Sequence, residues 1–373
     1  MREKVRIGDV ARRAGVSVGT VSNVLNRPQI VSAQTLQVVH RAIEDLGFVP
    51  NASARQLREG ASRMAGVMVL DITNPFFTEM ARGIEDRLIE AGLSMLLASS
   101  DADPDRERVI LQHFAQQRLR GVLLTPSRGT FDNLPALTER GIDVVLLDHR
   151  AAGPGVAAVV TDDAAGAESA VAHLITLGHR RIGFLNGPSK LQQCRERRAG
   201  AGRAVESAAG AAELIEVRTD RLDSAGGETA LAELLGGHPD VTAVFCVNDL
   251  VALGAMRHAR VAGRTVPGEL SVIGYDDVPF AGELAVPLTS VRQHTYQLGR
   301  RAADLLLDPQ NRRQVVFAPE LVIRSSTAPP ADRRRKARRG PTTGGTRTAS
   351  EPGPAPRKEV RRPRTDPEWQ VRR

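Results

Sequence analysis

Five outward-facing residues near the amino terminus have small or amide side chains, a combination that suits contact with the edges of DNA bases. They belong to segment 17–26, in which Val21, Val24 and Leu25 have the spacing of one buried helix face. The opposite face is left to small and amide side chains, namely Val18, Gly19, Thr20, Ser22 and Asn23. A short helix with such a face suits the major groove of DNA. An ordinary helical hairpin inside a larger core is the alternative interpretation.

Three short helices are expected to hold this surface in position. Apolar spacing predicts a first helix over 7–14, which Gly15 ends because glycine readily takes the left-handed conformation. Ser17 can cap the second helix, since its hydroxyl accepts a free backbone N–H, and Ser32 can do the same for a third. The sequence therefore predicts a helix-turn-helix DNA-binding domain over 1–49.

The next segment, 50–63, begins with a proline and is expected to be a hinge helix followed by a linker. Residues 50–58 could form one short helix, but a helix of that length is unstable alone. Either a partner or ligand orders it, or the segment is a plain linker.

From residue 64 onward, apolar strand patterns alternate with helical patterns. Strands are expected at 66–70, 93–98, 121–125, 144–148, 158–161, 181–186, 214–217, 243–247, 270–275 and 320–324. Helices are expected at 76–88, 104–118, 131–140, 164–177, 195–209, 225–235, 250–262 and 296–307. This alternation predicts two doubly wound parallel sheets, hence two α/β lobes with a ligand site between them at the carboxyl ends of the strands.

The lobes are expected to exchange chain segments. We assign the N-lobe to about 64–161 and 292–320, and the C-lobe to about 162–291 and 321–328. Residues 329–373 are rich in Pro, Gly, Thr and Arg and have almost no aliphatic side chains, so they are expected to form a disordered basic tail.

Charge and cysteine content restrict the function classes. The net charge of +8 is distributed as +5 over 1–63, −6 over 64–330 and +9 over 331–373, which favours a polyanion bound at the head. Cys194 and Cys246 are the only cysteines and do not suggest a disulfide framework. Without a secretory signal or a membrane-length apolar run, a cytoplasmic location is expected.

Enzymatic chemistry is not indicated by any motif in the chain. No nucleophile–base pair, metal-ligand spacing or phosphate-binding lysine motif stands out, so we expect no catalytic residue, metal or cofactor. His173 and His179 favour structural roles. The competing class is a solute-binding protein with the same two lobes and no DNA-binding activity.

Several stretches in a fixed order carry a resemblance to a known family. They are IGDVARRAGVSVGTVSNVLN, VSAQT, LGFVPNASARQL, GVMVLDITNPFF, HLITLGHRRIGFLNGP, AVFCVNDLVALGAM and VIGYDD. Over residues 5–328 the chain resembles the lactose-repressor (LacI/GalR) family of bacterial transcription regulators. The resemblance implies a helix-turn-helix head on a body like a periplasmic binding protein. It also implies a homodimer bound to a pseudo-palindromic operator, and a small polar effector such as a carbohydrate.

The resemblance assigns DNA contacts to the head and hinge. Val18, Gly19 and Asn23 would face base edges, where an amide can pair with adenine and a valine can touch a thymine methyl. A phosphate or water contact is the alternative for Asn23. Phosphate-facing groups would be Ser17, Thr20, Ser22, Asn26, Ser32 and Thr35, each of which could instead be a cap or a solvated hydroxyl.

In the hinge the resemblance implies DNA contacts from Asn51, Ala54 and Leu57. Leu57 would insert into the minor groove at the operator centre, at an unstacking cost of about a few kcal/mol that the contacts of a bent site offset. Packing of Leu57 onto the body is the alternative.

The resemblance also implies an effector site. Its residues would be Asn74, Phe76, Arg197, Asn248, Asp249 and Asp276, and Asp148 is a further candidate because it lies near a strand end. Together they are a donor and acceptor set suited to a polar or polyhydroxylated ligand. A turn-forming role for Asp276 and a core position for Phe76 are the alternatives. Sugar-binding members often place an aromatic platform where this chain has Arg221 and Leu222. A non-sugar effector therefore stays open.

Overall fold

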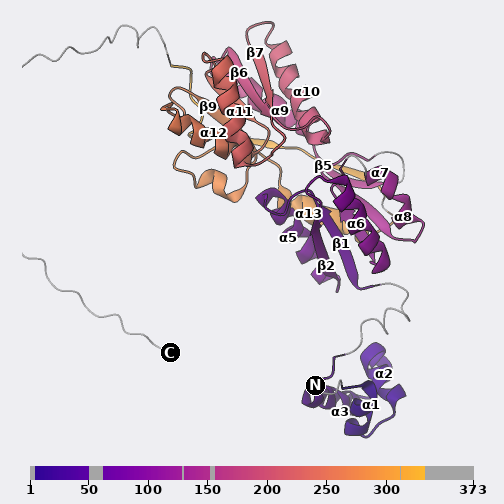
Figure 1. Ribbon diagram of the computed structural model, residues 1–373. Coiled ribbons are helices and arrows are strands. Elements are labelled where there is room, and N and C mark those ends of the chain that lie inside the picture. The colour runs from indigo at the N-terminus through magenta and orange to yellow at the C-terminus, as the bar shows by residue number, and fades with distance from the viewer. Residues whose placement is uncertain (1–4, 50–61, 128–129, 152–155, 311, 332–373) are drawn as a thin grey trace, which may run out of the picture. The chain divides into compact units, whose positions relative to one another are not determined.

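The computed structural model describes residues 5–49, 62–127, 130–151, 156–310 and 312–331 (Figure 1). The head has three helices and one 3-10 turn: α1 (Ile7–Ala14), α2 (Val18–Asn26), η1 (Pro28–Ile30) and α3 (Ala33–Leu46). Val10, Val21 and Val39 are fully buried where the three helices meet. Gly15 ends α1 with a φ of 66°, a conformation that glycine adopts at little cost. The predicted helix-turn-helix is confirmed.

The first sheet of the body has the strand order β11-β5-β4-β3-β1-β2, and all its pairings are parallel. Its strands are β1 (Met64–Val69), β2 (Ser94–Ser99), β3 (Gly121–Leu124), β4 (Asp143–Leu147), β5 (Ala157–Thr161) and β11 (Gln314–Phe317). Its helices are α5 (Pro75–Glu90), α6 (Pro104–Gln116), α7 (Thr130–Asn133), α8 (Pro135–Thr138) and α13 (Thr295–Leu307). Both faces are covered, because Val67 packs in one core with Phe77 of α5 while Met68 packs in another with Phe114 of α6.

The second sheet has the order β12-β10-β9-β8-β6-β7, and it is parallel except for the antiparallel pair β10–β12. Its strands are β6 (Arg181–Asn186), β7 (Glu213–Arg218), β8 (Ala243–Cys246), β9 (Ser271–Asp276), β10 (Thr289–Arg292) and β12 (Glu320–Val322). Helices α9 (Asp163–Thr176), α10 (Gln192–Ser207), α11 (Ser224–Gly237) and α12 (Asp249–Val261) pack as the pairs α9–α10 and α11–α12, and η2 (Pro279–Gly282) follows β9. At the centre, the rings of Phe184 and Phe245 stack with centroids 4.9 Å apart.

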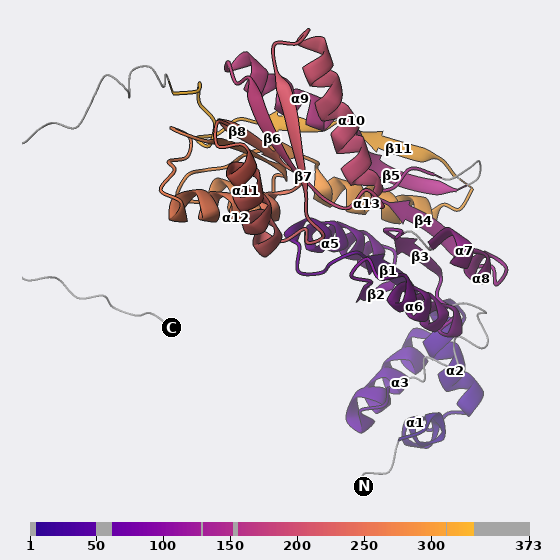
Figure 2. The same cartoon turned by 45° about the horizontal axis from the view of Figure 1, so that its top comes forward.

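The chain crosses between the two sheets several times. After β10 in the second sheet it forms α13, which lies beside α5 of the first sheet (Figure 2). It then adds β11 to the first sheet and β12 to the second. The two α/β lobes expected from the alternating pattern are therefore both present.

Three details of the expected elements were wrong. The helix predicted over 131–140 is two short helices, because Pro135 has no N–H and cannot donate a backbone hydrogen bond to the preceding turn. Strands β10 and β11 were not predicted, since each is only four residues long and lacks a long apolar run. The last predicted strand, 320–324, ends at Val322.

None of the helices in the described residues is long and apolar enough to cross a membrane. No group of three or more His, Cys, Asp or Glu side chains among these residues is arranged to hold a metal ion.

Candidate functional site

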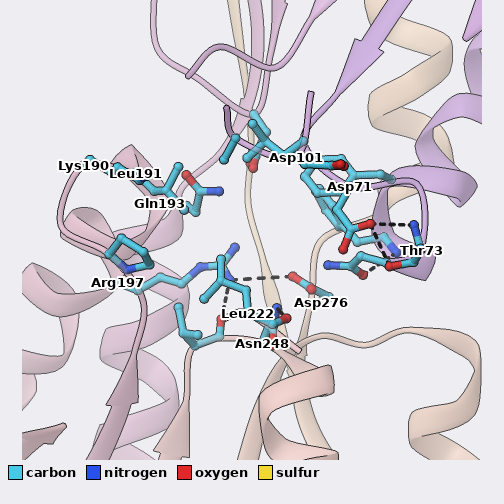
Figure 3. Close-up of a pocket in the computed structure, with 18 of the residues that line it drawn as sticks. Asp71, Thr73, Asp101, Lys190, Leu191, Gln193, Arg197, Leu222, Asn248 and Asp276 are labelled. Atoms are coloured by element: carbon cyan, nitrogen blue, oxygen red, sulfur yellow. Dashed lines mark hydrogen bonds and ion pairs between the residues drawn. The ribbon is translucent and has the colours of Figure 1, made fainter. Parts of the chain in front are cut away.

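A cavity of about 410 Å³ lies at the carboxyl ends of strands from both sheets (Figure 3). The first sheet contributes residues that follow β1, β2 and β4. The second contributes residues that follow β6, β7 and β8, together with the last residue of β9. Parallel strands end at the same edge of a sheet, so loops distant in sequence meet there. The cavity is therefore placed where the alternating pattern predicted a ligand site.

Six of the seven residues predicted to contact an effector line this cavity, and one does not. The six are Asn74, Phe76, Asp148, Arg197, Asn248 and Asp276. The carboxylate of Asp249 instead accepts hydrogen bonds from the Ser290 hydroxyl at 2.6 Å and the Val278 N–H at 2.9 Å. These bonds join the first turn of α12 to β10 and to the loop after β9. Asp249 therefore has a structural position behind the cavity, which corrects its predicted place in the site.

Arg197 is the central cation of the cavity and is almost completely buried, at 3% exposure. Its Nε donates to Asp163 at 2.8 Å, and Nη1 donates to the carbonyl of Val247 and lies 3.7 Å from an Asp276 oxygen. Its guanidinium carbon lies 3.6 Å from the centroid of the Tyr275 ring, a cation–π contact. Burial by itself would lower the pKa of Arg197, but the surrounding carboxylates, Asp163 first, raise it.

Asp276 ends β9 with an unusual backbone φ of 108° that aims its carboxyl group toward Arg197. The Gln293 amide donates to this carboxyl group at 2.7 Å. Burial raises the pKa of Asp276 to about 7, although Arg197 and Gln293 both act to lower it. The group therefore changes charge near neutral pH.

Asp148 occupies the matching position in the first sheet, directly after β4, and also has a positive φ, of 51°. Its side chain is buried and accepts no hydrogen bond from any other residue that the structure describes. Burial raises the pKa of Asp148 well above its usual range, and repulsion from Asp163 raises it further. A buried acceptor without a donor favours a ligand that supplies one.

Two asparagines in the cavity also begin helices. Asn74 caps α5 by accepting the N–H of Phe76 at 3.0 Å. Asn248 caps α12 by accepting the N–H of Val251 at 2.8 Å, while its amide donates to the carbonyl of Leu222 at 3.0 Å. Asn248 thus fixes the loop that carries Leu222 into the cavity.

Sequence reasoning missed several polar side chains that line the cavity. They are Asp71, Thr73, Asp101, Lys190, Gln193 and Asp220. Most of them follow directly after a strand or precede the next helix. Ligands bind at the carboxyl ends of parallel strands, and this rule applies equally to every loop that follows a strand. It does not predict which of these loops reach the cavity.

The predicted DNA-reading residues lie as expected on the surface of α2. Val18 is 48% exposed, and Gly19 and Asn23 are also exposed. The Ser17 hydroxyl accepts the N–H of Thr20 at 3.0 Å. Thr20 is half-buried, so this side chain is less available than the sequence suggested.

The other head residues predicted to face phosphates make local hydrogen bonds. Ser32 caps α3 by accepting the N–H of Thr35 at 3.3 Å, and the amide of Asn26 donates to the carbonyl of Ser22 at 2.6 Å. These are the capping roles left open as alternatives, and they do not prevent a phosphate contact. The hinge predictions for Asn51, Ala54 and Leu57 lie outside the described residues.

The raised pKa of Asp148 predicts that ionisation of this buried carboxyl group destabilises the folded protein. The folded protein binds the Asp148 proton more tightly than the unfolded chain, so this group stabilises folding at low pH and loses that contribution as pH rises through the folded pKa. Asp148→Asn cannot ionise and should raise the midpoint of thermal unfolding at pH 8 by about 2–4 °C, with a smaller gain at pH 5. Asp101→Asn, which replaces an exposed carboxyl paired with Arg106, should give no gain. Equal behaviour of the two variants would contradict this account.

A helix-turn-helix head followed by two α/β sheets around a polar cavity defines the class of regulators that combine DNA binding with a body like a periplasmic binding protein. Residues 6–51 match the model of "Bacterial regulatory proteins, lacI family", and residues 171–327 match the "Periplasmic binding protein-like domain". The chain belongs to the lacI family and is a DNA-binding transcriptional regulator.

Relatives and solved structures agree with this assignment. The transcriptional regulator GalR of Escherichia coli K12 is 34% identical over 330 residues, covering 87% of this chain and 96% of GalR. The repressor PurR of Photobacterium profundum is 32% identical over 86% of this chain and 98% of its own length. The Lac repressor dimer bound to operator and the anti-inducer ONPF has a TM-score of 0.79 at 28% identity, over 87% of this chain and all of that one. A CelR–cellobiose complex has a TM-score of 0.65 at 32% identity, over 86% and 99%.

Proposed function

We propose that this regulator is a repressor that binds a pseudo-palindromic operator as a homodimer in the cytoplasm, and that a small polar effector in the cavity controls its affinity for DNA. The observation that carries the proposal is the cavity itself, in which Arg197 and Asp276 from one sheet lie with Asp148 from the other. The Lac repressor dimer bound to operator and PurR, a named repressor, support the assignment. Relatives named as regulators and repressors give no support to an enzymatic role.

We assign a function to each part of the chain. Residues 1–49 would bind the operator, and 50–63 would form a hinge helix and linker. Residues 64–328 would bind the effector and dimerise, with the N-lobe and C-lobe divided as in the sequence prediction, and 329–373 would be a disordered basic tail.

For the effector we propose a ligand rich in hydroxyl groups. Asp148 and Asp276 can accept hydrogen bonds from hydroxyls, and Asn74 lines the same cavity. A sugar fits this set, and two solved relatives contain cellobiose and ribose. Leu222 lines the cavity where an aromatic platform was expected in sugar-binding members, so ring stacking at that position is not part of the proposal.

Control would arise from two states of the body. In one, the paired hinge segments meet and fold together on DNA, and in the other they are held apart. The effector can shift this balance only by its difference in affinity for the two states. Effector binding between the lobes supplies such a difference, because the cavity is built from loops of both sheets and its shape depends on their relative positions.

The test is a selection of bound DNA from a random pool with the full-length protein, repeated with candidate polar metabolites. We expect a two-fold symmetric site whose recovery changes with one metabolite. Asn23→Ala should weaken binding to that site by about 1–3 kcal/mol and relax the preference at one base pair in each half-site. Thr229→Ala, an exposed position on α11, is the matched control and should bind normally. Failure to enrich any sequence would favour the solute-binding alternative.

A further inference from the structure

We propose that an anion-binding subsite adjoins the effector cavity, and that the effector carries a phosphate or carboxylate group there. A second cavity of about 480 Å³ is lined by Ser127, Phe131 and His149 on the side of the first sheet and by Ser189, Lys190 and Arg195 on the side of the second. Lys190 lines both cavities. One ligand can therefore extend from the effector cavity past Lys190 into the second cavity.

The charge of the second cavity differs from that of the first. Among the described residues, its lining contains Lys190 and Arg195 and no aspartate or glutamate, whereas the effector cavity is lined by several aspartates. Neither Lys190 nor Arg195 forms an ion pair with any residue in the described part of the chain. Because both cations face one cavity without a counter-ion, an anionic group there would be attracted from two sides.

Arg195 is held in position by the loop that precedes α10. Its Nη1 donates to the carbonyls of Ser189 and Lys190 at 2.9 and 3.0 Å. These acceptors are neutral, so the guanidinium charge is not compensated and its other N–H groups remain for a ligand. The neighbouring Glu196 is already paired, because its Oε1 accepts from Arg150 at 2.9 Å and from Gln192 at 2.7 Å.

Two further features supply hydrogen-bond donors. Helix α10 begins at Gln192 without a side-chain cap, so its first N–H groups and the positive end of its dipole are free to favour an anion. Ser127 is 6% exposed, and its hydroxyl is buried without any hydrogen-bond partner. The backbone N–H of Ser127 donates to Glu107 at 3.1 Å, so that carboxylate is bonded to the main chain of the loop. The Ser127 hydroxyl could donate a hydrogen bond to a ligand oxygen and would then no longer lack a partner.

This inference rests on the proposed function and narrows it to an effector with a hydroxylated part and an anionic end. Phosphate monoesters and carboxylic acids share the required chemistry. They differ in the number of acceptor oxygens, since a phosphate can meet Lys190, Arg195 and the start of α10 together, whereas a carboxylate has two oxygens to share among them.

The experiment is calorimetric titration of the full-length protein with inorganic phosphate, and in a second arm with acetate, at constant ionic strength. Lys190→Gln/Arg195→Gln removes both cations, and Arg203→Gln is the matched control, because Arg203 lies on α10 and pairs with Glu168 away from both cavities. We expect saturable binding to the wild type, at least about tenfold weaker binding to the double variant, and no change in the control. The wild type, the double variant and the control all keep the basic head, so any phosphate bound by the head contributes equally to the three titrations.

Stronger binding of phosphate than of acetate would assign a phosphorylated effector, and the reverse order a carboxylated one. The proposal is overturned if neither anion binds saturably to the wild type, or if the double variant binds as tightly as the wild type. The double variant should still bind selected operator DNA, which shows that it is folded. Absence of saturable anion binding to a wild-type protein that still binds selected operator DNA would reject this subsite while leaving the proposed function in place.

Discussion

Arg197→Met is expected to lower the free energy of unfolding by about 3–5 kcal/mol, because it removes one partner of a buried ion-pair network. Asp163 and Asp276 would lose their only close cation among the described residues, and both carboxyls are buried. Methionine preserves much of the side-chain volume, so the loss would be mainly electrostatic. Chemical denaturation with urea measures it, and Arg203→Met on the same helix should change stability by less than about 1 kcal/mol, as expected for an exposed pair.

The pH dependence of this variant separates electrostatics from packing. Burial already raises the pKa of Asp163 and Asp276 in the folded protein, and Arg197 opposes that rise. Without Arg197 the folded pKa of each group would rise further above the unfolded value, so the variant's stability would fall as pH increases from 5 to 8. The destabilisation should therefore be larger at pH 8 than at pH 5. A loss that is small, or equal at both pH values, would contradict the role given to Arg197.

Gly200→Ala is expected to destabilise the body by about 3 kcal/mol, because the close crossing of α9 and α10 leaves no space for a methyl group. A Cβ at Gly200 would lie 1.9 Å from the carbonyl oxygen of Ala164, which is backbone and cannot move aside as a side chain can. The two helices would have to separate. Urea denaturation of the purified variant gives the size of the effect.

Gly202 is the matched control for this substitution, two residues further along α10. A Cβ there would meet nothing within 4 Å. Gly202→Ala should therefore stabilise the protein by about 0.5–1 kcal/mol, the usual gain from replacing glycine in a helix interior. The prediction fails if the two variants change stability in the same direction by similar amounts.

Local signals in the sequence were sufficient for the head and for the layered body. Glycine after an apolar helix face identified the end of α1, and Ser17 and Ser32 identified the starts of α2 and α3, because these effects act within one helical turn. Buried strands alternating with helices indicated two parallel sheets. Short strands such as β10 and β11 escaped notice, since a strand of four residues without a long apolar run gives little local signal.

Some residues of the candidate site could likewise be named from the sequence, and others could be placed only by the tertiary structure. From the amino-acid sequence by itself, Asp148 could be named from its place near a strand end, and Arg197 and Asp276 from the family resemblance of their motifs. Only the tertiary structure decided that Asp249 lies behind the cavity while Lys190 and Asp101 line it. The physical reason is that strand order and helix packing bring separate loops together, and these set the direction, burial and charge environment of each side chain, which no local pattern encodes.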